Sequence, residues 1–117
     1  MTDEHELAKA KVFIVVEIIE YQSNSVVIKT ILKKTTGSIS ALSFDTGERF
    51  SESTSPFDTF LLVIEGKAEV IIDGISNILD TGQSITIPAL SRNQIVANER
   101  FKMISTVIKS GYEDISV

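Results

Sequence analysis

Hydrophobic and polar residues alternate with a period of two over much of this chain, which is the pattern of half-buried β-strands. The pattern is clearest in residues 26–34 and 38–44, which are separated by a predicted turn at residues 35–37. It places Val26, Ile28, Thr30 and Leu32 on one face of the first strand, and Lys29 and Lys33 on the other. Leu42 and Phe44 are expected to share one face of the second strand.

Shorter segments of the same kind follow a polar loop that is predicted to begin at Asp45. The further predicted strands span residues 59–66, 67–74, 76–79, 84–89, 93–97 and 101–109. Tight turns are predicted around Gly66 and Gly74, because each glycine follows an acidic residue between two apolar runs. Strands that recur about every 8 to 12 residues, with turns between them, predict an all-β sandwich or small barrel.

The first twenty residues have a different pattern. Residues 2–10 are predicted to form a short helix with Thr2 as its N-cap, or else a tail. Residues 11–19 are a β-branched apolar run, predicted as a buried strand, with a helical turn as the alternative. The chain is thus divided into an N-terminal tail or short helix, residues 1–10, and a single barrel domain, residues 11–117.

Composition limits the classes of function. A chain of 117 residues with 43% hydrophobic content has the size of one domain, and its lack of cysteine excludes disulfides and thiolate metal sites. The acidic N-terminus does not resemble a signal peptide, and no apolar run approaches the about 20 residues of a membrane span. The net charge of -5 disfavours nucleic acid, and Lys29, Lys33 and Lys34 are expected to be solvated. We therefore expect a cytoplasmic protein without a nucleic-acid or membrane partner.

Two sets of spacings in the chain are similar to a known pair of motifs. In the first set, Gly47 is followed after five residues by Ser53, Thr54 and Ser55, then by Thr59 and Gly66. In the second set, Gly82 is followed after five residues by Pro88, then by Leu90, Asn93 and Ala97. In these spacings the chain resembles the cupins. The resemblance implies a double-stranded β-helix, or jelly-roll barrel, over almost the whole chain.

The resemblance also implies where a metal would bind. Ser53, Ser55, Thr59 and Asn93 stand where metal-binding cupins carry His, His, Glu and His. Hydroxyl and amide oxygens are poor ligands for transition metals, which take imidazole, thiolate or carboxylate donors, so we expect no metal and no cofactor. Glu52 and Asp58 are adjacent carboxylates, and the period of two turns them away from the pocket unless a one-residue bulge intervenes.

We expect a ligand pocket instead of a catalytic centre at these positions. The candidate residues are Ser53, Ser55, Thr59 and Asn93, with Phe60 and Met103 as apolar neighbours. No catalytic residue is predicted, because the single histidine, His5, lies in the N-terminal tail and Tyr21 lies near one end of the barrel region. Leu90 in place of the family's glycine predicts a different backbone after Pro88.

These observations predict a metal-free, cupin-like barrel that binds an unknown small molecule or has lost its catalysis. One alternative is an isomerase-like or oxygenase-like enzyme that uses an unusual metal or acid-base group. Another is a homodimeric interaction module, because the very apolar residues 12–19 and 59–65 predict a homodimer that forms through a sheet face. Whether residues 11–20 stay on their own barrel or cross to a second subunit remains open at this point.

Overall fold

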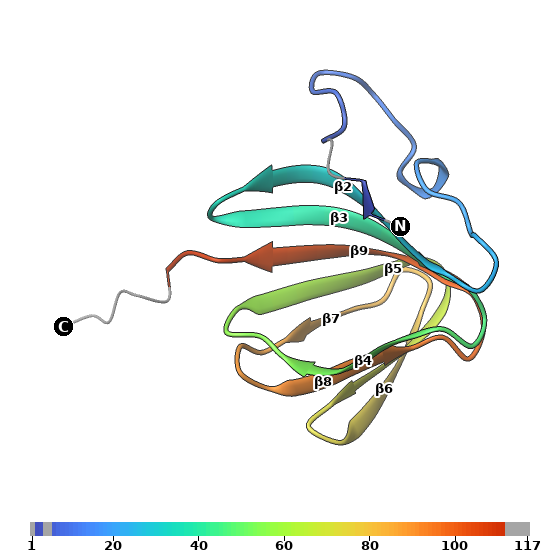
Figure 1. Ribbon diagram of the computed structural model, residues 1–117, viewed down its shortest axis with the longest axis vertical. Helices are drawn as coiled ribbons and strands as arrows, with labels where there is room; N and C mark the ends of the chain where they lie inside the picture. The colour runs from blue at the N-terminus through green and yellow to red at the C-terminus, as the bar shows by residue number, and fades with distance from the viewer. Residues whose placement is uncertain (1, 4–5, 112–117) are drawn as a thin grey trace.

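The computed structural model describes residues 2–3 and 6–111, and the regular secondary structure of these residues is almost entirely β (Figure 1). The elements in chain order are β1 (Thr2–Asp3), the 3-10 helix η1 (Val15–Glu17), β2 (Val26–Lys34), β3 (Gly37–Phe44), β4 (Arg49–Thr54), β5 (Asp58–Ile72), β6 (Ile75–Asp80), β7 (Ser84–Ile87), β8 (Arg92–Val96) and β9 (Phe101–Ile108). The predicted all-β class is confirmed. Within the described ranges no helix is long and apolar enough to cross a membrane.

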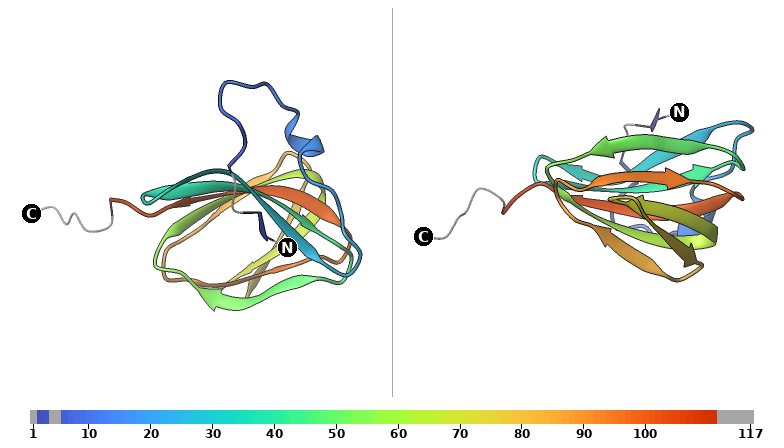
Figure 2. Two further views of the ribbon diagram at one scale, coloured as in Figure 1. Left: turned by 45° about the horizontal axis from the view of Figure 1, so that its top comes forward. Right: turned by 90° about the horizontal axis from the view of Figure 1, so that it is seen from below.

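The strands form a sheet that curls over on itself (Figures 1 and 2). Its order is β1-β2-β3-β9-β5-β8-β4, and β6 and β7 pair with β5 beside this path. The first half of β5 pairs with β9 and β7, and its second half pairs with β6 and β8. One strand therefore joins the two walls of the barrel, as the predicted jelly-roll requires.

The change of wall within β5 occurs at Gly66. The sequence predicted a tight turn there, and this prediction is wrong, because β5 runs without interruption through Gly66. A bulge at Ile64 and the positive φ of Gly66, 83°, bend the strand instead. The turn predicted at Gly74 is confirmed, since Asp73 and Gly74, with φ of 49° and 83°, close the hairpin between β5 and β6.

The core fills the closed end of the barrel. Phe44 and Phe101 stack with ring centroids 4.6 Å apart, and Phe50 meets Phe44 edge-on at 4.9 Å. Other residues of the core include Leu42, Leu61, Val63, Ala68, Val70, Leu79 and Met103. Leu42 and Phe44 share this inward face, as the alternation predicted.

A bulge in β2 changes the face of its last residues. Thr30 pairs with Ser40 and Leu32 pairs with Ile39, so Ile31 is an extra residue. Residues directly opposite each other on antiparallel strands share a face, so Leu32 turns outward and Lys33 turns inward, opposite to the prediction. The prediction of a strand over residues 26–34 is otherwise confirmed.

The N-terminal predictions are corrected. Among the described residues of 2–10 there is no helix, because Thr2–Asp3 pairs in parallel with β2 and the chain turns at Ala10, whose φ is 62°. Residues 11–19 do not form a strand, because they have no strand partner, and the 3-10 helix η1 realises the alternative of a helical turn. Only Ile19 in this segment is buried. His5 lies outside the described residues.

Candidate functional site

A pocket of about 260 Å³ lies beside the aromatic core, and Phe50 belongs to both. Its lining residues are Leu42, Phe50, Ser53, Ser55, Thr59, Leu61, Ile87, Asn93, Ile95, Ser105 and Val107. The four polar positions predicted from the motif spacing therefore lie in one pocket. Hydroxyl, amide and apolar side chains make up this lining, and no charged side chain of the described residues contributes to it.

Strand β4 supplies one wall because of a bulge. This strand lies in the segment that the sequence predicted as a polar loop, and its pairing with β8 corrects that prediction. Phe50 is opposite Ile95 and Ser53 is opposite Asn93, so two residues of β4 face the single residue Gln94. The extra residue brings both Phe50 and Ser53 onto the inward face, where strict alternation would have separated them.

Strands β5 and β9 supply the facing wall. Thr59 is opposite Ile87 on one side and Val107 on the other, and Leu61 is opposite Ser105. Phe60 lies between Thr59 and Leu61 and therefore points outward, with 41% of its surface exposed. Phe60 is therefore not among the residues that line this pocket.

Met103 is also not a lining residue. It is fully buried and lies opposite Val63 and Leu42, one step deeper along the inward row of β9. The residues that the sequence reasoning missed continue the same row, since Ser105 and Val107 follow Met103 at intervals of two. The period-two signal of β9 was sufficient to find both of them.

Hydrogen bonds fix some of the polar groups and leave others available. The Asn93 Nδ2 donates to the backbone oxygens of Ser53 and Ser91, at 3.4 and 3.5 Å, which ties β8 to β4. The Ser55 Oγ accepts from the backbone N–H of Phe57 at 3.2 Å. The hydroxyls of Ser53, Thr59 and Ser105 form no hydrogen bond with other described residues. They are not fully buried either, because no fully buried side-chain polar atom of the described residues lacks a partner. These hydroxyls are therefore accessible to a ligand.

The pocket residues do not fit a transition metal. The bulge in β4 does not bring Glu52 into the pocket, because its Oε1 lies 3.3 Å from the Arg92 Nη2 on the exposed face. The Asp58 Oδ1 accepts a hydrogen bond from the backbone N–H of Ala89 at 2.7 Å and is not a lining residue. No group of three His, Cys, Asp or Glu residues suited to a metal ion occurs in the part of the chain that the structure describes. The donors at the pocket are neutral oxygens, which supply neither charge nor softness.

Leu90 has a left-handed backbone with φ of 71°. This is a conformation that glycine adopts with least strain, and here a leucine adopts it. The Leu90 N–H donates to the Ser55 oxygen at 2.6 Å, and its side chain is 73% exposed. The turn after Pro88 is thus held against the loop that carries Ser55.

The main titratable cluster lies on the outer face of the barrel, away from the pocket. The Tyr21 hydroxyl donates to the Glu65 Oε2 at 2.6 Å, and the Arg100 guanidinium lies 4.4 Å from the centroid of the Tyr21 ring. The Lys102 Nζ donates to the Val16 oxygen at 2.8 Å. Burial, followed by the hydrogen bond to Glu65, raises the pKa of the Tyr21 hydroxyl above its ordinary value. This cluster attaches the segment around η1 to the sheet and does not face the pocket.

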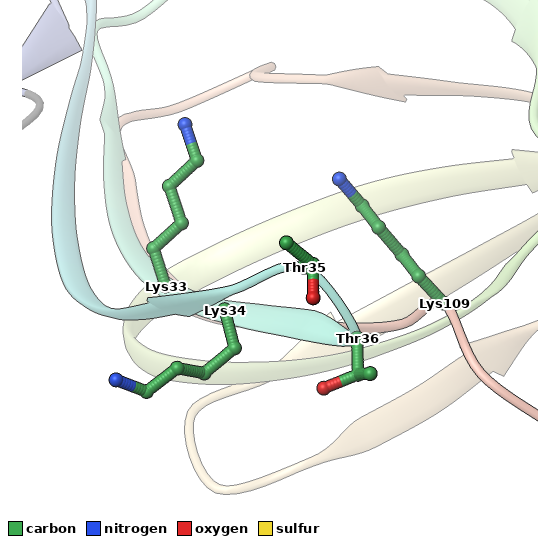
Figure 3. A pocket seen from close by; sticks show the side chains of 5 residues that line it. All are labelled: Lys33, Lys34, Thr35, Thr36 and Lys109. Atoms are coloured by element: carbon green, nitrogen blue, oxygen red, sulfur yellow. The ribbon is translucent and has the colours of Figure 1, made fainter.

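A wider hollow of about 690 Å³ lies at the turn between β2 and β3 (Figure 3). It is lined by Lys33, Lys34, Thr35, Thr36 and Lys109. Figure 3 shows that Lys33 and Lys109 project to one side of the turn and Lys34 to the other. The three ammonium groups therefore do not converge on a single point.

Comparison with solved structures identifies the fold. A conserved protein of unknown function from Streptococcus pyogenes is similar, with a TM-score of 0.85 and 25% identity over 92% of this chain and 94% of that one. A cupin superfamily protein from Desulfitobacterium hafniense has a TM-score of 0.83 and 25% identity over 91% and 97% of the two chains. This chain is a cupin-fold protein. A cupin 2 conserved barrel domain protein from Leptotrichia buccalis is 28% identical with a TM-score of 0.77, over 80% of this cupin-fold chain and 46% of that chain.

No family model matches the sequence of this cupin-fold chain, and no curated protein matches it. The resemblance to the cupins predicted from glycine and proline spacing is confirmed by the structural neighbours. The spacing is retained in this cupin-fold barrel while the side chains that would hold a metal are replaced.

Proposed function

We propose that this cupin-fold barrel is a metal-free binding module for a small molecule, whose uncharged part enters the pocket at the open end. The single observation that carries the proposal is the uncharged pocket of about 260 Å³ with polar groups from four strands or their ends. Its volume lies just below the about 300–1,000 Å³ of common small-molecule sites, which favours a small ligand.

The lining indicates the chemistry of that uncharged part. The hydroxyls of Ser53, Thr59 and Ser105 both donate and accept hydrogen bonds, which suits a hydroxyl, carbonyl or amide group of a ligand. The side chains of Leu42, Phe50, Leu61, Ile87, Ile95 and Val107 cover an apolar portion beside it. A charged group inside this lining would lose its hydration without gaining a counter-charge, which disfavours it.

We interpret the pocket as a binding site and not a catalytic centre, because none of its lining side chains titrates near neutral pH. General acid-base catalysis needs such a group within reach of the substrate. Lys102 is buried on the outer face of the barrel, where its Nζ donates to the Val16 oxygen and not into the pocket. The enzyme alternative would therefore require a group that the lining does not contain.

A thermal-unfolding screen with small neutral amphiphiles tests the proposal. We use 1,2-hexanediol and hexanamide, which combine a polar head with a short apolar chain, and we expect the midpoint to rise with ligand concentration. The variant Ser105→Leu fills the pocket and should abolish the rise. Thr106→Leu makes the same kind of change one residue later on the outward face, and this control should retain it. A rise that persists in Ser105→Leu contradicts binding in the pocket.

A second function, self-association, is favoured by the exposed segment before η1. Val12, Phe13 and Ile14 are 102%, 44% and 58% exposed, and the segment runs outside the sheet in Figure 1. A second copy is the proposed partner, because each copy presents the same exposed apolar segment, so two copies can cover each other's segment by the same contacts.

Light scattering tests this second function. We expect a dimer for the natural chain and a monomer for the double variant Val12→Ser, Ile14→Ser. Ile78→Ser replaces another exposed isoleucine, 52% exposed, on β6, and this control should remain dimeric. A natural chain that scatters as a monomer at all accessible concentrations contradicts the proposal.

A further inference from the structure

We propose that the small molecule bound in the pocket carries an anionic group, which Lys109 binds at the rim with Lys33 nearby. This inference rests on the proposed function, since it concerns the part of the same ligand that extends beyond the uncharged lining. It assigns the ligand to the class of small carboxylates or phosphates with an uncharged body.

The position of Lys109 follows from the inward rows of the barrel. Ser105 and Val107 line the pocket, and Lys109 follows at the next interval of two, immediately beyond the end of β9. Its backbone N–H donates to the Thr36 oxygen at 2.8 Å, which holds this end of the strand against the β2–β3 turn. Two residues of extended chain span about 6.6 Å, so Lys109 begins one step outside the pocket.

The Lys109 side chain lies beside the ring of Phe57. Thr59 is opposite Val107 on the antiparallel strands β5 and β9. Phe57 lies two residues before Thr59 and Lys109 lies two residues after Val107, so Phe57 and Lys109 are the next opposite pair. The Lys109 Nζ lies 5.9 Å from the centroid of the Phe57 ring, so these two side chains face each other. Phe57 is also attached to the pocket, because its N–H donates to the Ser55 Oγ at 3.2 Å. The ammonium group is therefore at the rim on the side of the lining.

Lys33 lies on the same face because of the bulge in β2. It is opposite Ser38, which is opposite Val107, which is opposite Thr59, so these four residues form one inward row across the sheet. Figure 3 agrees, because Lys33 and Lys109 project to the same side of the turn and Lys34 projects away. Without the extra residue Ile31, this lysine would face outward.

The charge balance at the rim favours an anion. Among the described residues no carboxylate lies within ion-pair distance of the Lys109 Nζ, although the chain as a whole has a net charge of -5. The Glu6 Oε2 accepts a hydrogen bond from the backbone N–H of Lys33 at 2.6 Å. Lys109 is thus the cation that we assign to the anionic group of the ligand, and Lys33 lies on the same side of the turn.

A pair of isosteric probes tests the inference. Hexanoate and hexanamide have the same apolar chain and differ in the charge of the head group. Their dissociation constants are measured from the chemical-shift changes of the backbone amides of Asn93, Ser105 and Val107. At low salt we expect the natural chain to bind hexanoate about two- to fivefold more tightly than hexanamide, the range of a solvent-accessible ion pair. The preference should shrink at high salt.

The variants separate this inference from the function beneath it. Lys109→Gln should reduce the preference for hexanoate and leave the affinity for hexanamide unchanged. Lys34→Gln removes an equal charge from the same turn but on the outward side, and it should keep the preference. Equal affinities of the natural chain for the two probes, or a preference for hexanoate that survives in Lys109→Gln, overturn the inference of an anionic group. Binding of hexanamide in the same experiment would still support the proposed pocket. If neither probe shifts the three amides, the proposed function fails and this inference fails with it.

Discussion

Gly66 is the position at which one substitution tests the account of the barrel most directly. The walls of the pocket meet only because β5 bends there and passes from its pairing with β9 to its pairing with β6 and β8. A Cβ added to Gly66 would overlap the backbone oxygen of Arg100 and would lie 3.0 Å from the Phe101 Cα. These are backbone atoms, so no flexible side chain can move aside.

Gly74 provides the matched control for the change Gly66→Ala. Both glycines have φ of 83°, and a Cβ at Gly74 would meet nothing within 4 Å. For Gly74→Ala we expect only the penalty of the left-handed backbone, about 1–2 kcal/mol of unfolding free energy. For Gly66→Ala the same penalty is increased by steric crowding of about 1–3 kcal/mol, which gives a total of about 2–5 kcal/mol.

Urea unfolding of the natural chain and of the two variants measures this difference. Agreement of the two losses within about 0.5 kcal/mol would refute the reasoning, because it would show that the close approach of β9 at Gly66 has no energetic effect. Failure of Gly66→Ala to fold while Gly74→Ala folds normally would support it.

Three further predictions concern the electrostatics and the pocket. Tyr21→Phe removes the hydrogen bond to Glu65 and should cost about 1 kcal/mol of stability. Because the pKa of the Tyr21 hydroxyl is raised in the folded state, its contribution to stability is full below about pH 10 and is lost as the pH rises through the folded-state pKa. The difference in stability between the natural chain and Tyr21→Phe should therefore shrink at high pH. The N–H of Asn24 at 2.8 Å, and then Arg100 at 3.0 Å, lower the pKa of the Asp45 carboxyl. Its contribution is therefore full above about pH 4 and is lost as the pH falls through the folded-state pKa, so acid unfolding of Asp45→Asn should depend less steeply on pH. The combined variant Ser53→His, Ser55→His, Thr59→Glu and Asn93→His should acquire affinity for zinc or nickel, measured by calorimetry. Elemental analysis of the natural chain should find no stoichiometric metal. If the variant gains no affinity, the inward placement of these four side chains is contradicted.

The local pattern of the sequence was sufficient for the strands and for part of the pocket. Alternation over residues 26–34 and 38–44 predicted β2 and β3, and glycine and proline spacing predicted the barrel. That spacing also selected Ser53, Ser55, Thr59 and Asn93, which the structure places in one lining. Spacing along the chain succeeds here because strand length and turn position are local properties that set which residues face inward.

Tertiary structure decided what local pattern cannot encode. Bulges at Ile31, in β4 and at Ile64 reverse the faces that alternation assigns, and a bulge is visible only against the strand that pairs with it. Residues 11–19 have the composition of a buried strand, yet Val12, Phe13 and Ile14 are exposed, because no strand of the barrel is available to pair with them. The sequence by itself therefore determined the fold and the polar character of the pocket. Long-range pairing decided which way Lys33 points, and thereby the charge at the rim of the proposed site.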